Sequence, residues 1–99
     1  MANLRKKLAD LIEITEITII PLKPQGTLVA FANFVINGWF YCGGVGIHSD
    51  LASRSYRLTY PTRKLKNGES VPLFHPLNKS IADQIEAAVT AEWERLINN

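Results

Sequence analysis

The 99-residue sequence has few of the residues that build small-protein metal sites and disulfides. It holds one cysteine, Cys42, which excludes an intrachain disulfide, and two histidines, His48 and His75. One thiol and two imidazoles are too few soft ligands for a structural zinc site, so we expect no metal and no other cofactor. Because disulfides belong to oxidising compartments, their absence fits a cytoplasmic protein.

Long apolar runs are also missing from the sequence. The most apolar span, residues 27–36, contains Asn33 and is much shorter than the ~20 residues that a membrane helix needs. Acidic residues interrupt the stretch that would have to follow a signal-peptide start at residues 5–7. The sequence therefore predicts neither a membrane partner nor a targeting segment.

Charge is nearly balanced over the whole chain but uneven along it. Eleven basic and nine acidic residues give a net charge of +2, which by itself says little about nucleic acid. Residues 54–79 carry +5, from six cations and Glu69 alone, whereas residues 80–99 carry −3, from four acidic residues and one arginine. The six cations are Arg54, Arg57, Arg63, Lys64, Lys66 and Lys79. A basic middle and an acidic end are thus two separate candidate surfaces.

Hydrophobic periodicity predicts strands first and one long helix last. Residues 12–20 alternate with a slip at Thr15–Glu16, which indicates a bulge, and Pro21 and Pro24 are expected to end this strand. Asn37–Gly38 is a strong hairpin turn. Further strands are predicted at residues 27–36, 39–47, 55–60 and 71–74, with a polar loop at 48–53.

From Ser80 onward the apolar spacing becomes helical. Ser80 and Asp83 suit a capping box with Ser80 as N-cap, and one apolar stripe runs from Ile81 to Leu96 and includes Trp93. Strands followed by a helix predict an α+β domain, a small antiparallel sheet with a long C-terminal helix packed on it. We assign residues 14–99 to this domain.

Residues 1–13 then form an N-terminal extension with helical spacing over residues 3–11. It is either a docking turn or a basic arm for nucleic acid, with its cations at residues 5–7.

No motif points to an enzyme. The glycine run at residues 43–46 has Ser49 where a phosphate loop needs a third glycine and no helix after it, so a bulged strand is favoured over a small-ligand site. His75–Pro76 marks a corner before the helix, without a recognisable nucleophile. Cys42 lies in an apolar aromatic segment, where a packed thiol is expected.

Two clusters suggest partners instead. Trp39, Phe40 and Tyr41 place aromatic rings on both faces of one strand, and we predict that they form a homodimer interface. The turn cations at residues 63–66 are either solvated or contact phosphates. Tyr56 and Tyr60 nearby either stack on bases or pack in the core.

Several short motifs follow one another in the second half of the chain. They are Pro61-Thr62-Arg63-Lys64, Asn67-Gly68-Glu69, His75-Pro76-Leu77-Asn78, and a helix with Ile85, Val89, Trp93 and Arg95. This succession resembles the bacterial SpoVG family (stage V sporulation protein G), which carries Pro-Ser-Lys-Arg, Asp-Gly-Glu, His-Pro-Ile-Asn and a helix with similar offsets. The resemblance covers roughly residues 14 to 96.

The resemblance implies a small homodimer that binds nucleic acid and regulates septation and sporulation. Family members carry cations early in the helix, where this chain has Ala82 and Gln84 beside Asp83. We therefore expect a SpoVG-like regulator that contacts DNA or RNA through the six cations of residues 54–79. The alternative is a non-enzymatic adaptor whose acidic helix face docks a basic protein; its residues are Asp83, Glu86 and Glu94.

Overall fold

The computed structural model describes residues 11–98 apart from 51 and 54. The N-terminal cations and Arg54 therefore lie outside the described residues. The elements are β1 (Ile14–Gln25), β2 (Leu28–Ile36), β3 (Phe40–Asp50), β4 (Ser55–Thr59), β5 (Thr62–Lys64), β6 (Ser70–Pro72) and α2 (Lys79–Ile97).

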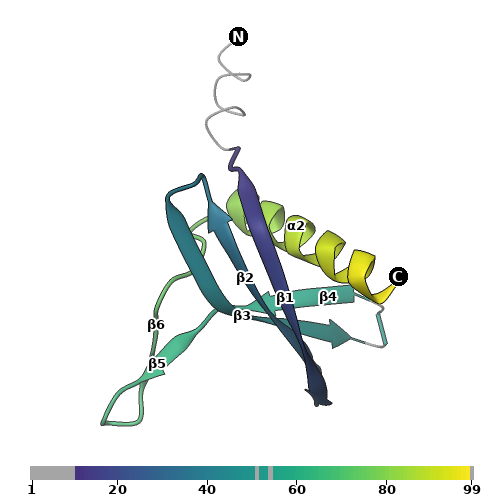
Figure 1. The fold of residues 1–99 in the computed structure, drawn as a ribbon. Helices are drawn as coiled ribbons and strands as arrows, with labels where there is room; N and C mark the ends of the chain where they lie inside the picture. The colour runs from purple at the N-terminus through teal and green to yellow at the C-terminus, as the bar shows by residue number, and fades with distance from the viewer. Residues whose placement is uncertain (1–10, 51, 54, 99) are drawn as a thin grey trace.

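Figure 1 shows a sheet with one long helix laid across one of its faces. The strands β1-β2-β3-β4 form this antiparallel sheet in that order, and β5 and β6 form a second, two-stranded sheet. The predicted α+β architecture, an antiparallel sheet followed by a C-terminal helix, is confirmed.

The first strand contains the predicted bulge but not the predicted end. Glu16 has a φ of 53° and the register with β2 shifts between Thr15 and Thr18. The strand then continues through both prolines to Gln25, so the expectation that Pro21 ends it is wrong. β1 is an edge strand, and an edge strand tolerates proline because one side of it needs no N–H donors.

The β2–β3 hairpin turns where the sequence predicted. Asn37 and Gly38 have φ values of 55° and 68°, as a two-residue hairpin turn requires, and the Trp39 N–H donates to the Ile36 carbonyl at 2.9 Å. β3 runs on to Asp50 because its last residues pair with β4, so the predicted polar loop at 48–53 is partly strand.

The glycine run is a bulged strand. Gly44 has a φ of 76°, the pairing with β2 shifts register opposite it, and its N–H donates to the Asn33 side-chain oxygen at 3.0 Å. The bulge bends β3 without ending it. The strand interpretation of residues 43–46 is therefore confirmed.

The core lies between the sheet and α2. Alternate residues of β2 and β3 face Ile85 and Val89 on the helix, and all of these are buried. The sheet residues are Ala30, Ala32, Phe34, Val45 and Ile47. Trp93 packs against this core with part of its surface exposed, so it belongs to the predicted helical stripe.

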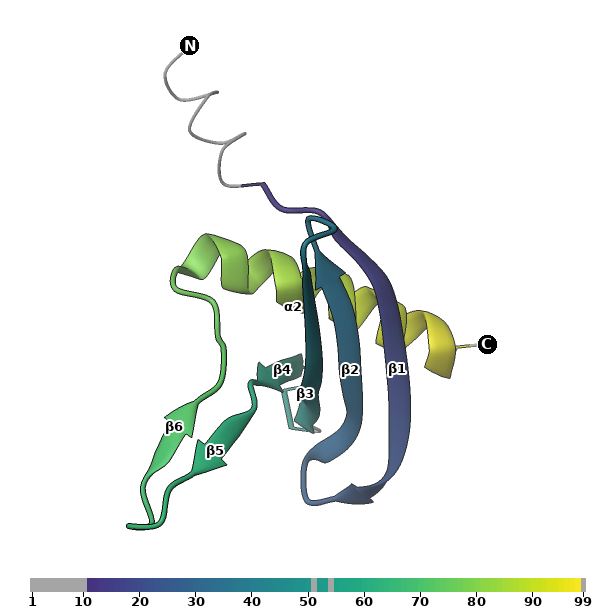
Figure 2. The ribbon, with the colours of Figure 1, turned by 60° about the vertical axis from the view of Figure 1, so that its left-hand side comes forward.

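Only one of the two strands of the second sheet was predicted from the sequence. Its outer strand is Ser70–Pro72 rather than residues 71–74, and it pairs with Thr62–Lys64, where no strand was predicted. Both views show this hairpin projecting away from the larger sheet (Figure 2). Its base is closed by a hydrogen bond from the Leu73 N–H to the Pro61 carbonyl, at 3.0 Å.

Candidate nucleic-acid interface

The projecting hairpin carries three of the six predicted cations. Arg63 and Lys64 lie on β5 and Lys66 lies in the turn that follows, and all three are exposed. We call residues 62–72, with these cations, the basic ribbon. Glu69 is its only carboxylate, so the ribbon has a net positive charge.

Backbone hydrogen bonds hold the turn of the ribbon in shape. The Leu65 N–H donates to the Glu69 carbonyl at 2.7 Å, and the Gly68 N–H donates to the Leu65 carbonyl at 3.0 Å. The Asn67 side chain accepts from the Glu69 N–H at 3.0 Å, and Gly68 has a φ of 90° that favours glycine. The Asn-Gly pair therefore fixes where the flanking cations stand.

The three ribbon cations are available to a ligand. Neighbouring side chains on a strand point to opposite faces, so Arg63 and Lys64 place charge on both sides of the ribbon. Among the described residues, none of the three forms an ion pair with a carboxylate. An unpaired cation that projects into solvent can exchange its counterion for a phosphate without breaking an existing contact.

Arg57, a fourth predicted cation, lies on β4, apart from the ribbon. It pairs across the strands with His48. Asp50, at the end of β3, has its pKa lowered first by hydrogen bonds from Ser53 and Ala52 and also by the Arg57 charge. Arg57 thus acts within a mixed-charge neighbourhood of its own, not on the basic ribbon.

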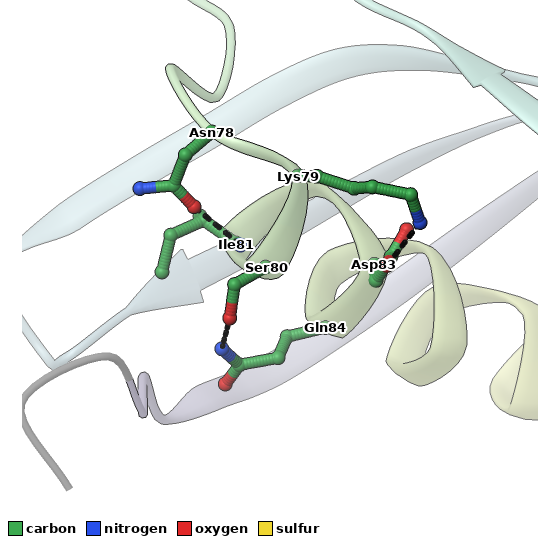
Figure 3. Close-up of polar contacts among 6 residues, drawn as sticks. All are labelled: Asn78, Lys79, Ser80, Ile81, Asp83 and Gln84. Atoms are coloured by element: carbon green, nitrogen blue, oxygen red, sulfur yellow. Dashed lines mark hydrogen bonds and ion pairs between the residues drawn. The ribbon is translucent and has the colours of Figure 1, made fainter. Parts of the chain in front are cut away.

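Lys79 is engaged at the start of α2, which residues 73–78 separate from the ribbon (Figure 2). Its ammonium nitrogen lies 2.8 Å from the Asp83 carboxylate, one helical turn later (Figure 3). This hydrogen bond is the main reason that the pKa of Lys79 is raised. The pair is exposed, so its stabilising effect is small, but it lowers the net charge that Lys79 offers to a phosphate.

The helix is capped by Asn78 rather than by Ser80. The Asn78 side-chain oxygen accepts from the Ile81 N–H at 2.9 Å, and Asn78 itself has an extended backbone (Figure 3). The predicted capping box at Ser80 and Asp83 is therefore wrong. Asn78 caps two residues earlier, and the Ser80 hydroxyl instead accepts from the Gln84 amide at 3.4 Å.

Gln84 occupies a position where the resemblance expects a cation. Its side-chain oxygen accepts from the Ile12 N–H at 3.0 Å, across 72 residues of sequence. This bond ties the entrance of β1 to the first turns of α2. At that position the helix start of this chain thus makes a structural polar contact and carries no cation.

The two tyrosines near the ribbon pack rather than project. Tyr60 meets Phe74 edge to face, with ring centroids 5.9 Å apart, and burial is the largest cause that raises the pKa of Tyr60 to about 12. Tyr56 is half-buried against the core. These contacts favour the packing interpretation over base stacking.

The aromatic residues after the β2–β3 turn are exposed in the single chain. Trp39, Phe40 and Tyr41 are 80%, 64% and 72% exposed. A homodimer would cover them, and that interface stays a prediction. Cys42 beside them is half-buried, and burial raises the pKa of its thiol, as expected for a packed cysteine.

Other kinds of site find little support in the described part of the chain. Within it, no three His, Cys, Asp or Glu side chains gather closely enough to hold a metal ion. His75 is exposed, and its Nδ1 lies 3.1 Å from the neighbouring Pro76 carbonyl. No helix among residues 11–98, leaving aside 51 and 54, is both long and apolar enough to cross a membrane.

Comparison with known proteins gives one consistent result. The family profile named SpoVG matches residues 12–95. Two similar proteins, each named "Putative septation protein SpoVG", come from Archaeoglobus fulgidus and Treponema denticola. The first is 27% identical over 83% of this chain and 94% of its own length, and the second is 28% identical over 84% and 87%. A third, from Clostridium acetobutylicum, is 23% identical over 87% and 88%.

Proposed function

Because the chain belongs to the SpoVG family, we propose that it is a non-enzymatic regulator that binds DNA or RNA through the cations of the basic ribbon. The proposal includes a part in septation, the process in the names of its relatives, and in the control of sporulation. It also includes a cytoplasmic homodimer that uses Trp39, Phe40 and Tyr41.

One observation carries the nucleic-acid proposal: three exposed cations without ion-pair partners stand on a hairpin that projects from the body of the protein. A two-stranded ribbon is narrow enough to follow a groove or a phosphate backbone. We restrict the proposed contacts to three of the six predicted cations, Arg63, Lys64 and Lys66. Lys79 is paired, Arg57 lies apart, and Arg54 lies outside the described residues.

The salt dependence of binding tests this proposal. Each phosphate that a cation neutralises adds about 0.9 to the slope of log affinity against log salt on duplex DNA, and about 0.7 on single strands. Three cations therefore contribute a slope of about 2.7 on a duplex for each chain that is engaged. We would titrate labelled single- and double-stranded DNA and RNA with the protein at several salt concentrations and follow fluorescence anisotropy.

Replacing Arg63, Lys64 and Lys66 together by alanine should remove most of this slope and weaken binding to all sequences alike. Lys64→Ala and Lys79→Ala are the matched pair for a single charge, because each removes one lysine and Lys79 is already paired with Asp83. If the ribbon variant binds with unchanged affinity and slope while Lys79→Ala loses both, the ribbon is not the interface.

The acidic helix face separates this proposal from the adaptor alternative. Asp83→Ala with Glu86→Ala removes two exposed carboxylates and should leave nucleic-acid binding equal or stronger, because a carboxylate repels phosphate. The adaptor function instead requires these carboxylates. Loss of a basic protein partner in this variant, together with normal behaviour of the ribbon variant, would favour the adaptor.

A further inference from the structure

An apolar groove of about 190 Å³ opens beside the first turns of α2. Strand β3, the segment before the helix and α2 itself all contribute to its lining, which includes Cys42, Phe74, Pro76, Ile81 and Ile85. A cavity of about 150 Å³ with a lining of this kind takes up a benzene molecule, so the groove has room for one large apolar side chain. Because apolar surface in contact with water is unfavourable, the groove favours an apolar occupant.

The described part of the chain begins close to this groove. The Ile12 N–H donates to the Gln84 side-chain oxygen on the first turns of α2, at 3.0 Å. Two residues later, Ile14 pairs with Ile36, which also lines the groove. Both views show the entrance of β1, the β2–β3 turn and the start of α2 at the same end of the molecule (Figures 1 and 2). Residues 1–10, which lie outside the described residues and which we call the N-terminal segment, therefore join the domain near the groove.

The sequence of the N-terminal segment suits an apolar groove. Leu4 and Leu8 are spaced by one helical turn, and Leu11, which is 62% exposed where the described chain begins, continues the same stripe. On a helix of this spacing the cations of residues 5–7 fall outside the stripe. A helix this short is marginal in water, so it needs its apolar stripe to be packed against something.

We propose that the N-terminal segment forms a short helix that docks on the domain and places Leu8, with Leu4 beside it, in the apolar groove. The reach is sufficient, because Leu8 and Ile12 are separated by about 6 Å along a helix and by about 13 Å along an extended chain. A short tether also holds the segment near the groove at an effective concentration on the order of millimolar, so a modest intrinsic affinity is enough.

Charge complementarity also favours the N-terminal segment as the occupant. Residues 1–9 contain three cations and no carboxylate, whereas residues 80–99, most of which form α2, carry a net charge of −3. A docked segment therefore lies beside a helix of opposite charge, and this attraction adds to the burial of the leucines. A second copy of the chain and a free apolar molecule are the other occupants that the groove can take, and the experiments separate them.

The single cysteine of the chain reports whether the groove is covered, because Cys42 is part of its lining. Leu4→Ser with Leu8→Ser removes the stripe, and N-ethylmaleimide should then label Cys42 about tenfold faster than in the wild type, since burial of one leucine contributes at least that factor. Leu65→Ser is the matched control: this leucine lies at the tip of the basic ribbon and is 39% exposed, so the rate should stay that of the wild type.

Three results of these measurements would overturn the proposal. The first is an equal labelling rate in the wild type and the double variant. The second is a rate that depends on protein concentration and not on the leucine stripe, which would assign the groove to a second copy of the chain. The third is a small apolar molecule found on the wild-type protein by native mass spectrometry and displaced when Cys42 is labelled.

A positional test needs no loss of the stripe as a whole. In Leu8→Cys, a short bis-maleimide should link the new thiol to Cys42 within one chain, and the product keeps the 11.1 kDa mass of a single chain plus the linker under denaturing conditions. Lys6→Cys is the control, because residue 6 lies on nearly the opposite side of the helix from Leu8. Equal yields of the intrachain link in the two variants would mean that the segment has no fixed orientation toward the groove, and would refute the docking.

The docking and the nucleic-acid proposal fail separately. Neither labelling nor cross-linking uses nucleic acid, and the ribbon variant should leave both unchanged. A protein whose N-terminal segment docks as proposed but which binds no DNA or RNA would contradict only the proposed function.

Discussion

A methyl group added at Gly46 should lower the free energy of unfolding strongly, because the space around this residue is already filled. It is buried, and a Cβ there would lie 2.6 Å from the Thr59 hydroxyl oxygen and 3.1 Å from a methyl carbon of Leu28. That hydroxyl is 2.9 Å from His48 Nε2, while His48 Nδ1 is 2.9 Å from the Thr27 hydroxyl. The methyl group must therefore push Thr59 away and break a link between β3 and β4.

The expected cost of Gly46→Ala follows from these contacts. Overpacking costs about 1–3 kcal/mol, and a lost hydrogen bond costs about 0.5–1.5 kcal/mol. We expect Gly46→Ala to lower the free energy of unfolding by about 2–3 kcal/mol. The measurement is urea unfolding followed by tryptophan fluorescence, at one fixed protein concentration because association stabilises the folded chain.

A double-mutant cycle shows whether the clash with Thr59 is the cause. Thr59→Ala removes the oxygen and alone should cost about 1 kcal/mol. The double variant should then be at least about 1 kcal/mol more stable than the sum of the single effects predicts. Gly43→Ala is the comparison: a Cβ there would lie 3.1 Å from the exposed ring of Tyr41, which can move aside, and 3.2 Å from the Asn33 side-chain oxygen, so it should cost less than Gly46→Ala. Strict additivity, or a cost for Gly46→Ala below about 0.5 kcal/mol, would refute this reasoning.

Three further changes test other parts of the fold. Trp93→Ala should cost about 3 kcal/mol, the lower end for a buried tryptophan, because its ring is only partly covered; a melting temperature close to wild type would mean that the ring does not pack on the core. Asn78→Ala removes the N-cap and should cost about 1 kcal/mol by urea unfolding, whereas Ser80→Ala should be nearly neutral. Burial, and then the Arg57 charge, lower the pKa of His48 from 6.5, so the unfolded chain binds this proton more readily. The folded state should therefore be most stable above about pH 6.5 and lose stability as the pH falls toward the lowered pKa, and His48→Gln should show a smaller loss in the same titration.

Some elements were predictable from the sequence because one local preference determined them. The Asn37–Gly38 turn needs two residues that accept positive φ, and the helical stripe up to Trp93 has a period that no strand shares. The edge position of β1 was not predictable in this way. Whether Pro21 ends a strand depends on what lies beside that strand, and only the assembled sheet decides it.

The candidate site, too, was predictable from the sequence only in part. The sequence identified the cations of residues 63–66, but β5 is three exposed residues long and has no apolar alternation to reveal it. Lys79 looked equivalent to the other cations until the helix start at Asn78 set it one turn before Asp83. The charges of a segment can be counted from its sequence, but whether two of them form an ion pair depends on where the helix that carries them begins.

The basic ribbon stands outside the buried core, whose fully buried residues all lie on β2, β3 and α2. Substitutions at its tip therefore bring little penalty in folding, so the surface of the hairpin can change without a change in the stability of the core. A hairpin of this kind is a natural place to exchange residues, lengthen the turn or graft another loop while the rest of the domain folds as before. For protein engineering, the domain is a scaffold with a replaceable exposed hairpin.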